Sequence, residues 1–245
     1  MGTIIFIFIL IVIGILIFSV YTHIQDKSFK REVVKPTLEN FNKDFVYTEL
    51  KGFDSKRIAE TRLVMRGSDY SSSDYVKGVH EGLAFECANV YIADTTTDSN
   101  NISHTVEYFN GQWLIIKPNH LIDNELYIID RKLSASNPNS IGFFKKANLQ
   151  KVETESIGFN KEFKVFAHDP MTAFKILSPQ KILELFENQA QDISVYLNKN
   201  ELHIAIYSDK KMFKRTEITQ ENRKQVEERI IDELLSLLHT SEILN

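Results

Sequence analysis

The stretch FNKEFKVFAHDPMTAFKILSPQ, residues 159–180, predicts a strand followed directly by two helix starts. Apolar residues alternate through EFKVFAH, as is typical of a short strand. Asp169 and Pro170 fit the N-cap and first position of a short helix, because an aspartate side chain accepts hydrogen bonds from free amides and proline has its φ already set. Ser178, again before a proline, predicts the start of the next helix. His168 lies where strand and helix meet.

The charged pair His168–Asp169 and the lone cysteine, Cys87, are the places where the sequence offers chemistry. A His–Asp pair can move a proton, but no nucleophile or second acid accompanies it, so the helix-start interpretation is favoured. A catalytic thiol needs a base and a partly exposed, electropositive setting, whereas Cys87 follows Phe85 on an alternating strand. No catalytic, cofactor-binding or metal-binding set is therefore predicted, and His168, Asp169 and Cys87 are the only single-residue candidates.

Alternating apolar residues predict further strands on both sides of this stretch. LQKVETES and ELYIIDRK are short strands upstream, and DISVYLNKNELHIAIYS is a hairpin that turns at residues 198–200. The side chains that should face the core in this hairpin are Ile193, Val195, Leu197, Leu202, Ile204 and Ile206.

A longer group of strands is predicted between residues 75 and 117. YVKGVHEGLAFECANVYIADTTT turns near residues 81–82 and then alternates, and TDSNN ends that strand. One face of it carries Phe85, Cys87, Asn89 and Tyr91. HTVEYFNGQWLIIKP follows with two interpretations. Asn110–Gly111 is a local hairpin signal, and alternatively one strand runs through Gly111 with the glycine at a bulge.

Two helices accompany these strands: SPQKILELFENQAQ, and TQENRKQVEERIIDELLSLLH near the end of the chain. The apolar stripe of the second should dock on the sheet; it consists of Val226, Ile230, Leu234, Leu237 and Leu238. The expected fold class is α+β, with an N-terminal transmembrane helix and a curved antiparallel sheet of seven or eight strands packed with two or three helices. A late hairpin followed by a helix also fits a pleckstrin-like roll, by analogy of fold alone.

The chain is expected to divide into a transmembrane anchor at 1–24, a juxtamembrane helical linker at 25–70 and an α+β body at 71–245. RGSDYSSSDY, residues 66–75, is predicted as a polar loop at the start of the body.

Within the linker, SFKREVV should extend the membrane helix until Pro36 kinks or stops it. DSKRIAE is predicted as a short helix with Asp54 or Ser55 as its N-cap.

TIIFIFILIVIGILIFSVY, residues 3–21, carries no charge and predicts a membrane-spanning helix. Nineteen residues at about 1.5 Å each span about 28 Å, close to the ~30 Å hydrocarbon core. No basic n-region precedes the segment and no Ala-x-Ala site follows it, so an uncleaved anchor is expected. The flanking cations Lys27, Lys30, Arg31 and Lys35 all follow it. The positive-inside rule then predicts a single-pass protein of the inner or cytoplasmic membrane, with the N-terminus out and the body cytoplasmic.

Composition excludes several other classes of protein. A net charge of −4 and a pI near 6.0 give no electrostatic footprint for nucleic acid. One cysteine excludes an intramolecular disulfide and a multi-cysteine zinc site. Nine dispersed glycines form no phosphate-binding loop, so no cofactor is expected.

Four stretches carry a family likeness: SDYVKGVHEGLAFECANVYI, EYFNGQWLIIKPN, residues 159–180 and LHIAIYSDKKMF. In this order, they resemble four parts of a bacterial domain family of unknown function, number 3137. These parts are its opening segment, its F-x-G strand, its most distinctive segment and its closing strand. The distinctive segment consists of a strand, an aspartate, a short helix and then Leu-(Ser/Thr)-Pro. The resemblance covers about residues 45–215, and only 159–180 is specific. It implies a hydrophobic N-terminal segment, a continuous strand through Gly111 and no assigned activity. It also implies a LemA-like membrane protein as a candidate partner. His168 departs from the acidic or polar residue that is usual in the family.

The function favoured is a membrane-anchored cytoplasmic binding or scaffold module of unknown ligand, non-catalytic, because the chain has an anchor and no catalytic constellation. An enzyme with a dispersed, unrecognised site and a membrane-organising, self-associating structural protein stay open. The lipid bilayer, through residues 3–21, is the one partner that the sequence itself indicates. A convergent polar pocket would favour an enzyme, and an exposed apolar groove would favour a binding protein.

Overall fold

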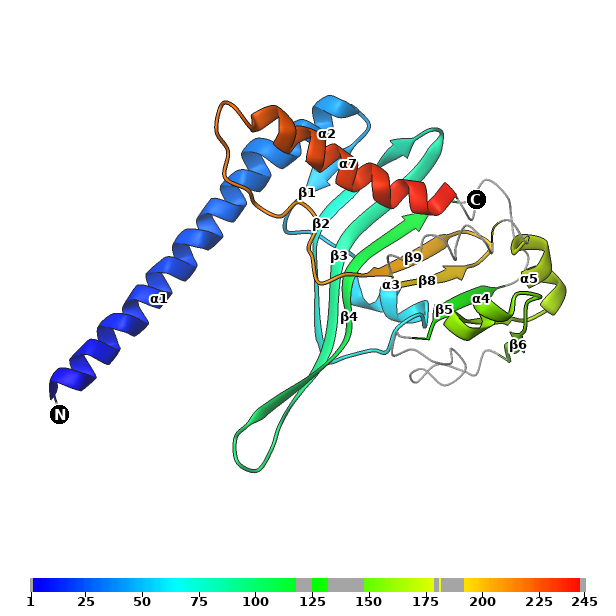
Figure 1. Cartoon of the computed structure of the whole chain (residues 1–245), viewed down its shortest axis with the longest axis horizontal. Coiled ribbons are helices and arrows are strands. Elements are labelled where there is room, and N and C mark those ends of the chain that lie inside the picture. Colours follow the sequence, from blue (N-terminus) through cyan, green and yellow to red (C-terminus); the bar gives the residue numbers. More distant parts are fainter. Residues whose placement is uncertain (1, 118–124, 132–147, 179–180, 182–191, 243–245) are drawn as a thin grey trace.

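A computed structural model describes residues 2–117, 125–131, 148–178, 181 and 192–242. The helices are α1 (Gly2–Phe29), α2 (Lys35–Phe41), α3 (Ser55–Glu60), α4 (Ile157–Glu162), α5 (Pro170–Ile176) and α7 (Arg223–Glu242), and a π-helical turn, η1 (Lys30–Val34), joins α1 to α2. The strands are β1 (Val46–Thr48), β2 (Asp69–His80), β3 (Leu83–Thr97), β4 (Ser103–Ile116), β5 (Leu126–Asp130), β6 (Gln150–Val152), β7 (Phe163–Ala167), β8 (Asp192–Leu197) and β9 (Leu202–Tyr207). Figure 1 shows a mixed helix and strand body at the end of one long N-terminal helix.

The strands form one antiparallel sheet in the order β1-β2-β3-β4-β9-β8-β5-β7-β6. The predicted α+β fold with an antiparallel sheet is therefore confirmed. The described residues contribute nine strands rather than seven or eight, because β1 has only three residues and too little pattern to be recognised. With β1 and β6 as its edges the sheet is open, so the described strands do not close into a roll.

Both faces of the sheet are buried against apolar side chains. One core contains the inward-facing residues of the β8–β9 hairpin and the stripe of α7, as predicted: Ile193, Val195, Leu197, Leu202, Ile204, Ile206, Val226, Ile230, Leu234, Leu237 and Leu238. The other core lies on the α3 side and contains Phe109, Trp113 and Tyr127. Figure 1 shows α7 lying across the sheet beside α2.

The predicted turn between β2 and β3 is confirmed, with positive φ at Glu81 (49°) and Gly82 (82°). β4 runs without a break through Gly111, so the long-strand interpretation is confirmed over the hairpin turn. The irregularity in its pairing lies between Ile92 and Ala93 of β3, so the glycine is not at a bulge. A Cβ at Gly111 would lie 2.0 Å from the Ile206 carbonyl oxygen, so the absence of a side chain lets β9 approach β4.

The prediction of a polar loop at residues 66–75 was wrong, because β2 begins at Asp69. Its hydroxyl groups pair within the sheet: the Ser72 Oγ accepts from the Phe53 amide at 3.0 Å and donates to the Asn89 carbonyl at 2.7 Å. A serine-rich strand is thus stabilised by side-chain hydrogen bonds, although its composition is that of a loop.

The membrane helix extends into the body, and Pro36 does not end it. Residues 30–34 form a π-helical turn in which the Lys35 amide donates to the Lys30 carbonyl, and Pro36 lies in the first turn of α2. The wider turn accommodates a proline that cannot donate an i→i−4 bond. Asp54 caps α3, as predicted, by accepting from the Lys56 amide at 2.8 Å.

The stretch 159–180 contains part of α4, all of β7 and all of α5. The Asp169 side chain accepts from the Met171 amide at 3.1 Å and caps α5, as predicted. α4 was not predicted; Ser156 caps it through the Phe159 amide. The helix predicted from Ser178 lies outside the described residues, except that the Ser178 Oγ accepts from the Lys181 amide.

The division at residues 24 and 70 stays a prediction. The segment between them contributes β1 to the sheet and Phe29, Val34 and Leu38 to the first core.

Candidate functional site

A charged network joins α3 to the sheet. The Arg57 guanidinium donates to both carboxylate oxygens of Glu86 on β3, at 3.0 and 3.1 Å. It also donates to Glu201, just before β9, at 2.7 Å. The Tyr75 hydroxyl on β2 donates to the same Glu86 carboxylate at 2.6 Å. One guanidinium fork thus joins two acids that are far apart in the sequence.

His203 extends this network into the sheet. The Trp113 indole nitrogen donates to the His203 Nδ1 at 3.2 Å. Because an indole N–H can only donate, Nδ1 is the acceptor and the ring proton sits on Nε2. Nε2 then donates to the Glu201 carboxylate at 2.9 Å. The buried ring is therefore neutral in this arrangement, and it positions one of the two acids that bind Arg57.

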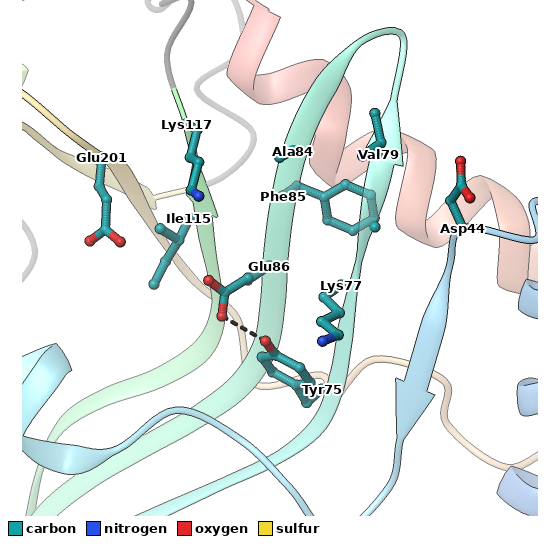
Figure 2. A pocket seen from close by; sticks show the side chains of 11 residues that line it. Asp44, Tyr75, Lys77, Val79, Ala84, Phe85, Glu86, Ile115, Lys117 and Glu201 are labelled. Carbon is teal, nitrogen blue, oxygen red and sulfur yellow. Dashed lines mark hydrogen bonds between the residues drawn. The ribbon is translucent and has the colours of Figure 1, made fainter.

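A cleft of about 340 Å³ lies beside this network, between the β2–β3 turn, β4 and the start of β9. Figure 2 shows the Tyr75 hydroxyl directed at Glu86 in the cleft, with Lys77 and Lys117 nearby. These two lysines come from the segments on either side of β3 and are exposed. The cleft offers both cationic and anionic groups, a set that can orient a small polar or charged ligand.

The ionisable groups around the cleft are not poised for proton transfer at neutral pH. The hydrogen bond from His203, together with Arg57, lowers the pKa of Glu201 to about 2. Burial alone would raise the pKa of Glu86, but hydrogen bonds from Arg57 and Tyr75 outweigh it and lower that pKa. Burial and the bond to Glu86 raise the pKa of Tyr75. A general acid or base works best with a pKa near the working pH, and the pKa values of Glu86, Glu201 and Tyr75 are all shifted away from neutrality.

A second polar cluster surrounds Asp74, whose side chain is fully buried where β2 changes register. Its carboxylate accepts from the Tyr47 hydroxyl at 2.6 Å, the Asn89 amide at 2.9 Å and the Lys30 ammonium at 3.0 Å. Asp74 adopts a positive φ of 57°, which turns its side chain into this cluster. Since Lys30 follows directly on α1, the cluster attaches the membrane helix to the sheet.

The three predicted candidates lie apart from the Arg57 network. His168 is partly exposed at the end of β7, and its Nε2 lies 3.3 Å from a Glu125 carboxylate oxygen. Asp169 caps α5. Cys87 is fully buried in the first core, and burial raises the pKa of its thiol to about 12. In the described part of the chain no group of three or more His, Cys, Asp and Glu residues could hold a metal ion.

Sequence reasoning missed the residues that the fold does bring together. Arg57 lies 29 positions before Glu86 and 144 positions before Glu201. A single sequence contains no signal that pairs residues so far apart. One signal was present for Glu86, a charged residue within the apolar first part of β3, residues 83–88.

The sequence profile of the family described as "Protein of unknown function (DUF3137)" matches residues 107–245. The match begins within β4, so it includes the specific stretch 159–180. No curated protein matches the chain. Among solved structures, the mycobacterial trehalose monomycolate transport factor A, TtfA, is similar at a TM-score of 0.47 and 10% identity, over 89% of this chain and 97% of that chain. A shared function does not follow from a similarity at that level.

Replacing Lys30 by methionine should destabilise the body by about 3–5 kcal/mol, because it leaves the buried Asp74 charge without its counter-ion. The double variant Lys30→Met/Asp74→Asn should recover part of this loss, since the charge is then removed as well. Urea unfolding of the detergent-solubilised chain measures both. Arg31→Met is the matched control: its side chain is 75% exposed. Equal losses in the Lys30 and Arg31 variants would contradict the role of the buried pair.

Glu201 should make stability depend on pH in a defined window. Because its folded-state pKa of about 2 lies below the ordinary 4.5, the ionised carboxylate stabilises the fold above pH 4.5, and this contribution is lost as the pH falls to 2. Glu201→Gln should cost about 1 kcal/mol at pH 7, after allowance for solvent screening, and almost nothing near pH 2. Glu228→Gln, in a pair whose glutamate is 59% exposed, should leave the unfolding curve unchanged at every pH. A Glu201→Gln deficit that does not vary with pH would refute this.

Proposed function

The chain belongs to the DUF3137 family of proteins of unknown function, and from that premise we propose that it is a membrane-anchored cytoplasmic binding or scaffold module. The ligand-binding surface in this proposal is the cleft beside Arg57. Its lysines, Lys77 and Lys117, are the groups that would contact an acidic partner.

The observation that carries the proposal is the attachment of the membrane helix to the body. One helix, Ile5–Phe41, is long and apolar enough to cross a membrane, and none of its most apolar window is buried. Its far end has the opposite character, because Val34 and Leu38 are fully buried in the first core. A helix with a lipid-facing half and a core-packed half holds the body at a fixed place beside the bilayer, as a tethered module requires.

The cytoplasmic orientation is supported by the cations that follow the apolar segment. Lys27, Arg31 and Lys35 are exposed, and the positive-inside rule counts such residues. Lys30 is paired with Asp74 inside the body, so it also anchors the fold. The single thiol, Cys87, suits a reducing compartment.

A binding role is favoured over an enzymatic one, although the cleft is polar. A polar cleft alone would favour an enzyme, but the pKa values of Glu86 and Glu201 are lowered and both acids are held by Arg57. Both carboxylates are therefore ionised at neutral pH. Lys77 and Lys117, both exposed at the cleft, fit the recognition of acidic groups. A LemA-like membrane protein is the partner that the family resemblance proposes.

Asn200→Cys should react with a membrane-impermeant thiol reagent only after the cells are permeabilised, because the β8–β9 turn would face the cytoplasm. Native Cys87 is fully buried and should not react in folded protein. Gly2→Cys is the matched control, and it should react in intact cells. Labelling of Asn200→Cys in intact cells would overturn the cytoplasmic orientation.

Crosslinking followed by detergent solubilisation and pull-down of the full chain should recover a protein or lipid partner above a tag-only control. The variant Lys77→Glu/Lys117→Glu should lose most of that recovery, because repulsion replaces attraction at the cleft. Lys161→Glu/Lys199→Glu changes the charge equally at exposed sites elsewhere and should retain it. Recovery of nothing above the tag-only control would contradict the binding role, and equal recovery by the two variants would contradict the cleft as its site.

A further inference from the structure

Residues 208–215, between β9 and α7, form a cationic segment, here called the basic loop. Its sequence is SDKKMFKR. Lys210, Lys211, Lys214 and Arg215 are exposed, whereas Met212 and Phe213 between them are buried in the first core. The loop therefore has an apolar centre held by the body and cations on both sides that face solvent.

The basic loop is fixed to the body at its centre. The Met212 amide donates to the Asn89 side-chain oxygen at 2.9 Å, and the Phe213 amide donates to the Glu233 carboxylate at 3.1 Å. The Phe213 ring meets the Tyr47 ring edge-on with 5.8 Å between centroids. Phe213 has a φ of 56°, a conformation that a bulky residue adopts only where its surroundings impose it. The four cations are thus displayed by a rigid backbone.

The same contacts place the loop next to the membrane helix. The Asn89 side chain, which accepts from Met212, donates to Asp74, and Asp74 also binds Lys30. In the view of Figure 1 the segment between β9 and α7 crosses the end of α1 that enters the body, and the hydrogen bonds through Asn89 and Asp74 link Met212 to Lys30. These contacts thus hold the basic loop near η1, the π-helical turn that follows α1.

That position lies within electrostatic reach of the bilayer surface. Lys30 is nine residues beyond Tyr21, the end of the apolar segment, and at about 1.5 Å per residue this is about 13 Å. The headgroup layer occupies about 5–8 Å of that distance. The remainder, about 5–8 Å, does not exceed the Debye length of about 8 Å at physiological ionic strength.

The cations of the loop are available for a ligand. Among the described residues, Lys210, Lys211, Lys214 and Arg215 form no ion pair. Asp209 is the one acid within the loop, and Glu217 follows it. Exposed Lys27, on the nearby helix, adds positive charge, whereas Arg31 is paired with Glu32 at 3.0 Å.

We propose that the basic loop binds the anionic headgroups of phospholipids in the membrane leaflet that faces the body. This contact sets the tilt of the body relative to the membrane. The ligand chemistry is the phosphodiester of an anionic lipid such as phosphatidylglycerol. The inference rests on the membrane anchoring in the proposed function. It does not depend on which side of the membrane the body occupies.

The test uses the full chain, reconstituted in vesicles of phosphatidylcholine alone or with about a third phosphatidylglycerol. A fluorophore is attached at Glu217→Cys, and a headgroup-attached nitroxide lipid is the quencher. Quenching should be about twofold stronger in the anionic vesicles, and about half a molar salt should abolish the difference, because salt screens the attraction.

In the same labelled chain, Lys210→Gln, Lys211→Gln, Lys214→Gln and Arg215→Gln together should remove the lipid dependence. A control with Lys56→Gln, Lys161→Gln, Lys175→Gln and Lys199→Gln loses equal charge at exposed sites outside the basic loop and should keep it. The inference would be overturned if the unsubstituted chain were quenched equally in both kinds of vesicle. It would also be overturned if the difference in quenching between the vesicles persisted at high salt. An inverted result in the topology labelling would leave this experiment unaffected, so failure here is distinguishable from failure of the proposed orientation.

Discussion

The buried pair between Lys30 and Asp74 is the contact on which the arrangement of the other parts depends. Charges withdrawn from water are costly unless they are paired and hydrogen-bonded. Asp74 meets this condition by also accepting from Tyr47 on β1 and Asn89 on β3. Asn89 in turn accepts from the loop before α7. One carboxylate therefore fixes the membrane helix, the edge strand and the basic loop relative to the sheet.

Burial of the sheet on both faces explains which elements could be predicted from the sequence. In β8 and β9 the inward residues recur at every second position, and the stripe of α7 recurs at helical spacing, so each pattern indicated its own structure. The Asp169–Pro170 helix start was predictable because capping depends on neighbours along the chain. These are local signals, and the pairing order of the strands has no such signal.

The remaining features depend on contacts between distant residues. RGSDYSSSDY has the composition of a loop, yet its hydroxyls and Asp74 find partners on β3 and the preceding segment, so it forms a strand. Pro36 was expected to kink or stop the helix, and the structure instead accommodates it with a π-helical turn at residues 30–34. The Arg57–Glu86–Glu201 network joins three separate elements, so its existence follows from the fold and could not be read from any one segment.

Two neighbouring cations, Lys30 and Arg31, differ in their surroundings because the helix is attached to the sheet by buried contacts. Lys30 turns inward to Asp74, whereas Arg31, one position later, is exposed to solvent. Because helix and sheet are joined by buried contacts, an attraction between headgroups and the basic loop would tilt the body and the helix together. The Arg57 cleft would move with it, since α3 and β3 belong to the same packed unit. The lipid contact would thus fix the direction in which the cleft meets a partner at the membrane.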